Sequence, residues 1–334
     1  MRFLLYKYQN TLILLSLFLS TTNTLYSQVA VRQSMYLMGS DFSITVVEQD
    51  SSKAKHYINI AVHEIKRIEK LISSWDQQSQ TYLINKNAGI KAVKIDKELF
   101  DLIERSNYIS QLTDGAFDIS YASMDKIWQF DGSMKEMPST KQIKASVAKV
   151  GYQKIILNKQ EKSIYLKEKG MKIAFGAIGK GYAADKAKQL LISKGVKAGV
   201  INASGDINTW GKQPNGKDWN VVIVNPLNKK KIFASSPITE GAVVTSGDYE
   251  KYVMFNNVRY THIINPKTGY PSTEIISASV FSQKSELADA LATSLFVMGI
   301  EVGLNLINQL PKIECILVNE QGQIHTSQGI TIQK

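Results

Sequence analysis

The second half of the chain consists mainly of short segments with strand character, and this pattern most restricts the folds available to it. From Tyr152 onward, β-branched and aromatic residues gather in short runs separated by Gly, Pro and Asn. Helical composition interrupts them at residues 181–195 and 285–299. This pattern predicts an α+β fold with an antiparallel, sheet-rich body, inserted helices and two intertwined subdomains, rather than a doubly wound parallel sheet. The expected strands are 154–158, 163–168, 197–204, 219–225, 231–236, 242–247, 258–264, 276–282 and 315–320.

The first half has a different character. Residues 42–50 alternate like a strand. A helix follows, because six apolar residues recur at spacings of three and four: Ala54, Ile58, Ala61, Ile65, Ile68 and Ile72. A second helix is expected over residues 97–113, and residues 121–150 are expected to form short helices and loops.

The composition is that of a globular protein with a basic surface. The 334 residues include 44% hydrophobic and 21% charged residues, and the net charge is +11. Lysines are dispersed rather than gathered in one block, which fits a solvated surface as well as an anionic ligand. Neither zinc-ligand spacing nor an aromatic-basic RNA motif is present, so nucleic-acid binding is disfavoured.

The N-terminus predicts export. Arg2 and Lys7 precede the apolar run TLILLSLFLS and the polar segment TTNTLYSQ, as in a secretory signal peptide cleaved after Ser27. A buried helix and an uncleaved anchor are the alternatives. No cysteine directly follows the apolar run, which argues against a lipoprotein. The single cysteine, Cys315, is expected in a buried strand, so no disulfide can form within the chain.

The segment IAFGAIGKGYAADKA, from Ile173, has the composition of a phosphate-binding turn. Gly176, Gly179 and Gly181 surround Lys180 where a helix begins, and a helix N-terminus with uncrowded N–H groups suits an anion. The spacing matches neither a P-loop nor G-x-G-x-x-G. Glycines that only permit close packing are an equally good reading at this point.

Two further positions carry candidate chemistry. Asp289 and Thr293 are four residues apart on the expected helix 285–299, so their oxygens share one face and could hold Mg²⁺. The alternative is that Asp289 lies on a solvent-exposed face and that Thr293 hydrogen-bonds to the backbone of its own helix. His262 lies just before the turn NPKTGYP, where it could bind phosphate or move a proton, or have a purely structural role.

Together the motifs resemble those of the ApbE family of FAD:protein FMN transferases. The resemblance runs from about Met35 to the C-terminus and is carried by segments that occur in one order. They are MGS, SSWDQQSQTYLIN, DGAFDIS, FGAIGKGYAADKA, NASGDIN, VVTSGDYEKY, THIINPKTGYP and ADALATSLFVMG.

The resemblance implies an enzyme with an α+β, T-fold-like body, formed here by residues 28–334 after a signal peptide of residues 1–27. Such enzymes use Mg²⁺ to transfer FMN from FAD to a Thr or Ser hydroxyl of a protein, and they release AMP. The implied partners are flavoprotein subunits of membrane electron-transfer complexes, and the implied location is the periplasm, with inner-membrane association left open. The alternatives are an FAD pyrophosphatase that yields FMN and AMP, and a non-catalytic FAD-binding protein.

The resemblance also implies roles for individual residues. The metal ligands would be the side chains of Asp289 and Thr293 and the carbonyl of Ala177. His262 would be the catalytic residue and would also contact FAD. The remaining positions that match the FAD site are Met38, Trp75, Ala116, Phe117, Asp118 and Lys180. Asp206 and Thr245 match recurring motif positions without a clear role.

Three positions depart from the family pattern. Ala174 stands where many relatives have an acidic residue that contacts the ligand. Gln80 replaces a frequent Glu, and ISYASMDKIW after Asp118 replaces a segment that usually contains proline and glycine. These departures concern how the flavin is bound and leave the implied metal ligands unchanged.

Overall fold

The computed structural model describes residues 28–247 and 252–331, without the side chains of residues 229–233. The predicted signal peptide, residues 1–27, lies outside the described residues. Within the described ranges, no helix has both the length and the apolar character needed to cross a membrane.

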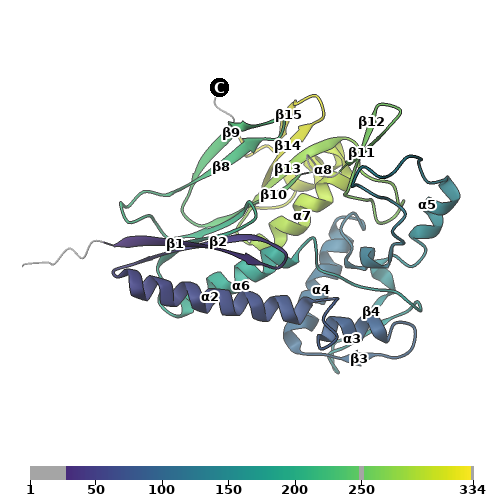
Figure 1. Ribbon diagram of the computed structural model, residues 1–334, viewed down its shortest axis with the longest axis horizontal. Helices are drawn as coiled ribbons and strands as arrows, with labels where there is room; N and C mark the ends of the chain where they lie inside the picture. Colours follow the sequence, from purple (N-terminus) through teal and green to yellow (C-terminus); the bar gives the residue numbers. More distant parts are fainter. Residues whose placement is uncertain (1–27, 248–251, 332–334) are drawn as a thin grey trace, which may run out of the picture.

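An eight-stranded sheet forms the body of the molecule (Figure 1). Its strand order is β1-β2-β6-β7-β10-β13-β14-β15, and every pair of neighbours is antiparallel. The antiparallel α+β body predicted from the sequence is therefore confirmed. The strands are β1 (Val29–Leu37), β2 (Ser40–Glu48), β6 (Ala198–Ala203), β7 (Asp206–Trp210), β10 (Gly241–Gly247), β13 (Ile275–Ser282), β14 (Glu314–Asn319) and β15 (Ile324–Thr326).

Four helices belong to this body: α2 (Ser51–Ile72), α6 (Gly179–Ser193), α7 (Ser285–Met298) and α8 (Ile300–Asn308). Asp50 caps α2 by accepting a hydrogen bond from Ser52 N–H, and all six apolar residues predicted to form its stripe are buried. Helix α6 packs between α2 and α7, and α7 lies against β10 and β13 (Figure 1). This layering brings the N-terminus of α6 against the first turns of α7.

A smaller part of the molecule comes from chain segments inserted between elements of the body. It holds α3 (Gln80–Lys86), α4 (Lys97–Leu112), the 3₁₀ turns η1 (Ile119–Ser123) and η2 (Tyr152–Lys154), and α5 (Thr140–Ser146). A three-stranded sheet, β3-β5-β4, is formed by Val93–Lys94, Ser163–Leu166 and Ile155–Asn158. The hairpin β11 (Tyr252–Phe255) and β12 (Val258–Thr261) rejoins this part much later in the sequence.

Aromatic packing joins the late hairpin to the earlier inserted segment. Trp128 stacks on Tyr260 with ring centroids 5.9 Å apart, and the indole N–H donates to the Gly269 carbonyl at 2.9 Å. Ile143 and Val253 are buried in the same cluster. The chain therefore passes between the two parts more than once, as the prediction of intertwined subdomains requires.

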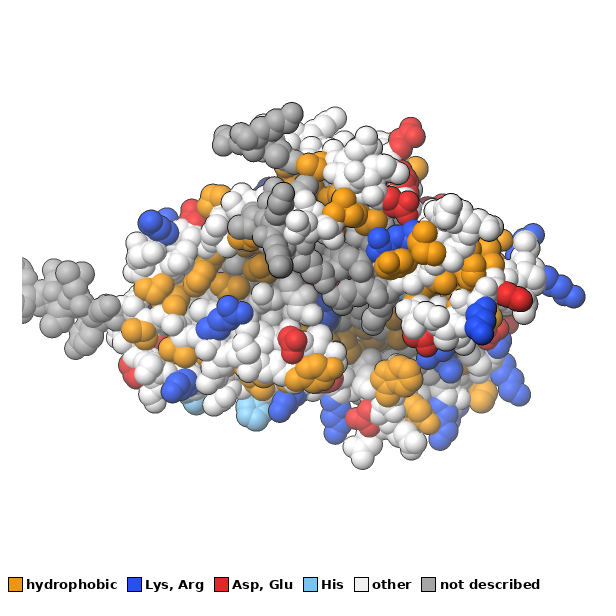
Figure 2. Space-filling model, turned by 45° about the horizontal axis from the view of Figure 1, so that its top comes forward, with side chains coloured by type: hydrophobic (Ala, Val, Ile, Leu, Met, Phe, Trp, Pro, Cys, Tyr) orange, Lys and Arg blue, Asp and Glu red, His pale blue; other side chains and the backbone are white. Residues whose placement is uncertain are grey.

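The remaining strands form the hairpin β8 (Trp219–Asn225) and β9 (Asn228–Ile238). Cys315 is fully buried in β14, as expected. On the face shown in Figure 2, Lys and Arg side chains are dispersed among acidic, apolar and neutral ones rather than gathered in one patch.

Candidate functional site

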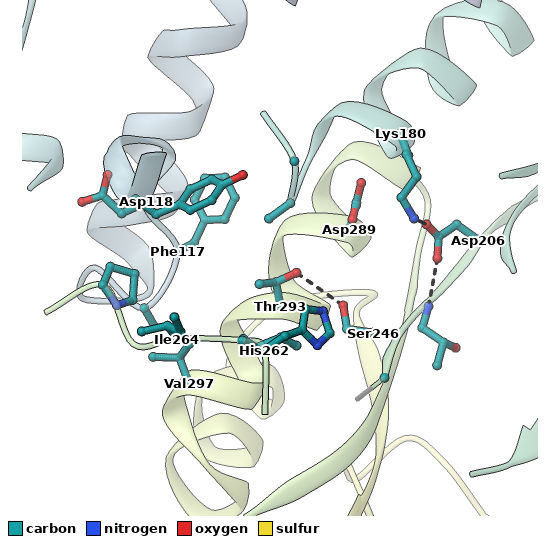
Figure 3. A pocket seen from close by; sticks show the side chains of 18 of the residues that line it. Phe117, Asp118, Lys180, Asp206, Ser246, His262, Ile264, Asp289, Thr293 and Val297 are labelled. Atoms are coloured by element: carbon teal, nitrogen blue, oxygen red, sulfur yellow. Dashed lines mark hydrogen bonds and ion pairs between the residues drawn. The ribbon is translucent and has the colours of Figure 1, made fainter. Parts of the chain in front are cut away.

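A cavity of about 550 Å³ lies where the body, the inserted segments and the residues after β12 meet (Figure 3). Its walls come from stretches that are far apart in the sequence. The lining residues are Ala116, Phe117, Asp118, Tyr121, Gly176, Ala177, Lys180, Ser204, Asp206, Thr245, Ser246, Gly247, His262, Ile263, Ile264, Pro266, Asp289, Thr293 and Val297. Most of the residues predicted for the site are thus brought together.

The glycine-rich segment forms the N-terminus of α6, and its three glycines are explained by close approach. None of them has a positive φ. A Cβ on Gly176 would lie 2.5 Å from the Tyr121 hydroxyl, one on Gly179 would lie 2.8 Å from Ile72 Cδ1, and one on Gly181 would lie 2.3 Å from the Ser285 carbonyl oxygen. Packing and anion binding are compatible here, because the same crowding holds the positive end of α6 at the cavity.

Asp289 and Thr293 project from adjacent turns of α7 into the cavity (Figure 3). Asp289 Oδ2 accepts a hydrogen bond from Gly181 N–H at 3.0 Å, and Thr293 Oγ1 lies 3.3 Å from Ser246 Oγ. In a regular helix, the Gly181 N–H would bond to the carbonyl four residues earlier, that of Ala177. Within the described part of the chain, no donor is hydrogen-bonded to the carbonyl oxygen of Ala177, a residue that lines the same cavity.

The environment of Asp289 favours its neutral form. The carboxyl group is buried beside Asp206, and the burial together with the negative charge of Asp206 raises its pKa to about 7, against the opposing effects of Lys180 and the Gly181 N–H. A buried carboxylate with this pKa gains most from a cation placed next to it. Asp289 is therefore suited to binding a metal ion.

Lys180 and Asp206 form an ion pair on the same side of the cavity as Asp289 (Figure 3), with Nζ and Oδ2 2.5 Å apart. Asp206 Oδ1 also accepts a hydrogen bond from Thr245 N–H at 3.3 Å. Burial lowers the pKa of Lys180, but the negative charges of Asp206 and Asp289 outweigh that effect, so the pKa lies above its usual value and the ammonium stays charged. Asp206, whose role was open in the sequence, thus holds Lys180 at the cavity.

His262 follows the last residue of β12 and points into the cavity beside Thr293 and Ser246 (Figure 3). On the other side lie Ala116, Phe117 and Asp118. Asp118 accepts hydrogen bonds from the backbone N–H groups of Ser120 and Tyr152, each at 2.7 Å, so its carboxylate holds η1 in place as well as lining the cavity. Burial raises the pKa of Asp118.

Met38 and Trp75 do not line this cavity. Met38 lies in the turn between β1 and β2, with its methyl group close to Gly179 at the start of α6. Trp75 is 82% exposed in the loop after α2, where the Ser73 hydroxyl accepts the backbone N–H groups of both Trp75 and Asp76. Since this turn leaves the indole in solvent, with Lys126 Nζ 5.9 Å from its ring, contact of Met38 and Trp75 with FAD stays a prediction.

Tyr121 is a cavity residue that the motifs did not indicate. Tyr121 lines the cavity, and burial raises the pKa of its hydroxyl. The only signal for it in the sequence was the departure of ISYASMDKIW from the family pattern. Ser204 and Ser246 were likewise not singled out, because isolated serines in turns and strands have no pattern of their own.

Comparison with known proteins gives one consistent result. The model of the ApbE family matches residues 38–317. A protein of Klebsiella pneumoniae named FAD:protein FMN transferase is 31% identical over 304 residues, which cover 90% of this chain and 92% of that protein. A Treponema pallidum protein of the same name is 29% identical and covers 80% and 78% of the two chains.

Solved structures agree with this result. The crystal structure of the ApbE protein of Thermotoga maritima superposes with a TM-score of 0.81 at 29% identity, covering 90% of this chain and 98% of that one. The apo flavinyl transferase ApbE of Pseudomonas stutzeri has the same fold, with a TM-score of 0.80 at 24% identity and coverage of 91% and 96%. By its motifs, its fold and its relatives, the chain belongs to the ApbE family.

Proposed function

We propose that this protein is a Mg²⁺-dependent FAD:protein FMN transferase, which moves FMN from FAD to a Thr or Ser hydroxyl of a protein and releases AMP. The observation that carries the proposal is that Asp289, Thr293 and Ala177 line one cavity. Curated relatives named FAD:protein FMN transferase support the same activity.

The residues at the cavity fit Mg²⁺. A carboxylate, a hydroxyl and a backbone carbonyl are hard oxygen donors, and Mg²⁺ typically takes few protein ligands and keeps phosphate and water for the rest. The Ala177 carbonyl has no hydrogen-bond donor in the described chain because Asp289 accepts the N–H that would normally reach it. Among the described residues, no group of three or more His, Cys, Asp and Glu side chains could hold a metal ion. The ligands proposed here are one carboxylate and two neutral oxygens.

Bound there, Mg²⁺ would neutralise the diphosphate of FAD and the charge that develops on departing AMP. The protein supplies the positioning. The N-terminus of α6 places the positive end of the helix dipole at the cavity, and Lys180 adds a fixed positive charge beside it. The acceptor hydroxyl oxygen would attack the FMN phosphorus as the bond to AMP breaks. His262, which lines the cavity, would take the hydroxyl proton or hold a phosphate oxygen.

Export and the acceptor class belong to the same proposal. The signal-peptide pattern of residues 1–27 supports a periplasmic location, and the acceptors would be flavoprotein subunits of membrane electron-transfer complexes. Both follow from the sequence and its resemblance to the family.

One experiment separates the candidate activities. The purified protein is incubated with FAD, Mg²⁺ and a Ser- or Thr-containing acceptor segment, and the acceptor mass and AMP are measured. A mass gain equal to one FMN, together with AMP, is the expected result. AMP without a mass gain would identify an FAD pyrophosphatase, and FAD binding without AMP would identify a binding protein.

A further inference from the structure

Asp185 is a buried carboxylate of α6 that does not line the cavity. It connects α6 to α7 and β7, and all three elements carry polar residues of the cavity. It is 7% exposed. Oδ1 accepts hydrogen bonds from Ser285 N–H at 3.0 Å and from the Asn208 amide at 2.6 Å, and Oδ2 accepts one from Glu286 N–H at 2.9 Å. Three residues from two other elements, α7 and β7, therefore bond to this one side chain.

Two of these bonds cap α7 from a neighbouring helix. The first turn of a helix leaves backbone N–H groups without partners, and a carboxylate there also interacts favourably with the helix dipole. The residue in the N-cap position of α7, Lys284, makes no side-chain capping bond. Asp185 supplies that function instead, so the start of α7 is fixed to α6 rather than to its own preceding loop.

One turn earlier on α6, Gly181 makes the second contact with α7. Gly181 and Asp185 are four residues apart and so lie on the same face of the helix. At Gly181 the helices are so close that a Cβ would lie 2.3 Å from the Ser285 carbonyl oxygen. The Gly181 N–H also donates a hydrogen bond to Asp289. The segment of α7 from Ser285 to Asp289 is thus held at both ends by α6.

The third bond of Asp185 runs to β7, the strand that carries Asp206. Asn208 and Asp206 lie two residues apart, on the same face of the strand. On α6, Lys180 and Asp185 are separated by a rise of roughly 7.5 Å, and two strand residues span roughly 6.7 Å. The Lys180–Asp206 and Asp185–Asn208 pairs therefore form two matching links between the same helix and strand.

We propose that Asp185 is a positioning residue for the metal and diphosphate site. By fixing α7 and β7 to α6, it sets where Asp289 and Thr293 lie relative to the Ala177 carbonyl and to Lys180, without touching the ligand itself. The inference rests on the proposed function, because it concerns the geometry of that Mg²⁺ site.

The test compares the wild-type protein with Asp185→Asn and with a control that loses only stability. Asparagine keeps the size of the side chain but removes its charge and places an NH₂ group against backbone N–H donors. The control is Ser327→Ala: Ser327 is 1% exposed, its hydroxyl accepts the Cys315 N–H at 2.8 Å, and it lies outside the cavity. Thermal unfolding is measured at saturating FAD over a Mg²⁺ titration, and kcat and KM for FAD are measured in parallel.

Loss of an outer partner of a metal site weakens metal binding by about 10- to 100-fold. We expect the Mg²⁺ concentration for half-maximal stabilisation to rise by about that factor in Asp185→Asn, with kcat reduced even at saturating FAD. Ser327→Ala should lower the unfolding temperature and leave the Mg²⁺ midpoint unchanged. An Asp185→Asn protein that behaves like Ser327→Ala would overturn the inference.

A milder variant covers the case in which Asp185→Asn does not fold. Asn208→Ala removes the link to β7 but leaves both bonds to α7. It should therefore raise the Mg²⁺ midpoint in the same direction but by a smaller factor. An unchanged midpoint in this folded variant would overturn the inference. If Mg²⁺ fails to stabilise the wild-type protein, the proposed function fails and this inference with it. If Mg²⁺ stabilises the wild type and the midpoints of the variants do not move, only this inference fails.

Discussion

Replacement of Gly181 by alanine tests the close crossing of α6 and α7 on which the candidate metal site depends. Two opposite effects compete. Alanine in place of glycine favours a helix by about 1 kcal/mol, so propensity alone predicts a more stable protein. The added Cβ, however, would lie 2.3 Å from the Ser285 carbonyl oxygen, 2.6 Å from its carbonyl carbon and 2.9 Å from Asp289 Cβ.

The clash decides the outcome. Two non-bonded heavy atoms pack at about 3.5 Å, so the two helices would have to separate by about 1 Å to admit the new Cβ. The atoms of Ser285 that it meets belong to the backbone and cannot rotate away as a side chain could. Overpacking of this kind lowers the free energy of unfolding by about 1–3 kcal/mol, which exceeds the gain in propensity. A shift of about 1 Å in Asp289 is also enough to lower the transfer rate by about 100-fold.

The assay combines chemical denaturation with FMN transfer to an acceptor segment. Gly303→Ala in α8 is the matched control, because the only atom closer than 3.9 Å to its Cβ would be Leu295 Cδ2, at 2.8 Å, which is the end of a side chain rather than backbone. We expect Gly303→Ala to retain stability and activity, and Gly181→Ala to lose both. A Gly181→Ala protein that is at least as stable as the wild type and fully active would refute the helix contact described above.

The proposed Mg²⁺ site predicts a pH-dependent affinity, because burial and then the charge of Asp206 raise the pKa of Asp289 to about 7. Since Mg²⁺ would compete with the proton, its apparent affinity in a thermal-shift titration should rise about tenfold per pH unit up to about pH 7 and level off above. An ordinary aspartate with a pKa of about 4 would instead give a flat profile from about pH 5.5 to 8. Without metal, the native state holds this proton and the unfolded chain does not between about pH 4 and 7, so stability should fall as the pH rises through that range and then stay constant. His262→Ala should lower FMN transfer while FAD still binds with similar affinity by fluorescence, and unchanged transfer would remove His262 from the mechanism. Gly176→Ala should weaken FAD binding, because the new Cβ would lie 2.5 Å from the Tyr121 hydroxyl oxygen. Adding Tyr121→Phe should restore binding, since the nearest remaining atom, Cζ, is 3.7 Å away. A double variant that binds FAD as weakly as the single one would contradict this coupling.

The elements with strong periodicity were predictable from the sequence. The apolar stripe of α2 and the pairing of Asp289 with Thr293 on α7 depend only on the geometry of one helix, which the spacing of the residues reveals. Strands β1 and β7 were not predicted, because their sequences, VAVRQSMYL and DINTW, mix polar and apolar residues without a clear alternation.

The contacts that complete the site could not be read from the sequence. The Lys180–Asp206 and Asp185–Asn208 pairs join residues more than twenty positions apart, and Gly181 meets α7 more than one hundred positions later. Such pairings depend on how helices and strands pack against one another. Tyr121 was missed for the same reason, because its importance comes from Gly176, which only the fold places beside it.

The origin of the cavity walls in stretches between Ala116 and Val297 has a consequence for how the protein becomes functional. Contacts between distant segments form late in folding, since the long loops between them must close first. The cavity proposed to bind FAD would therefore form only when folding is nearly complete, and FAD would stabilise only the finished fold. Recovery of flavin binding during refolding would then report the last step of folding, after the signals of helix α2 and hairpin β1–β2 have already returned.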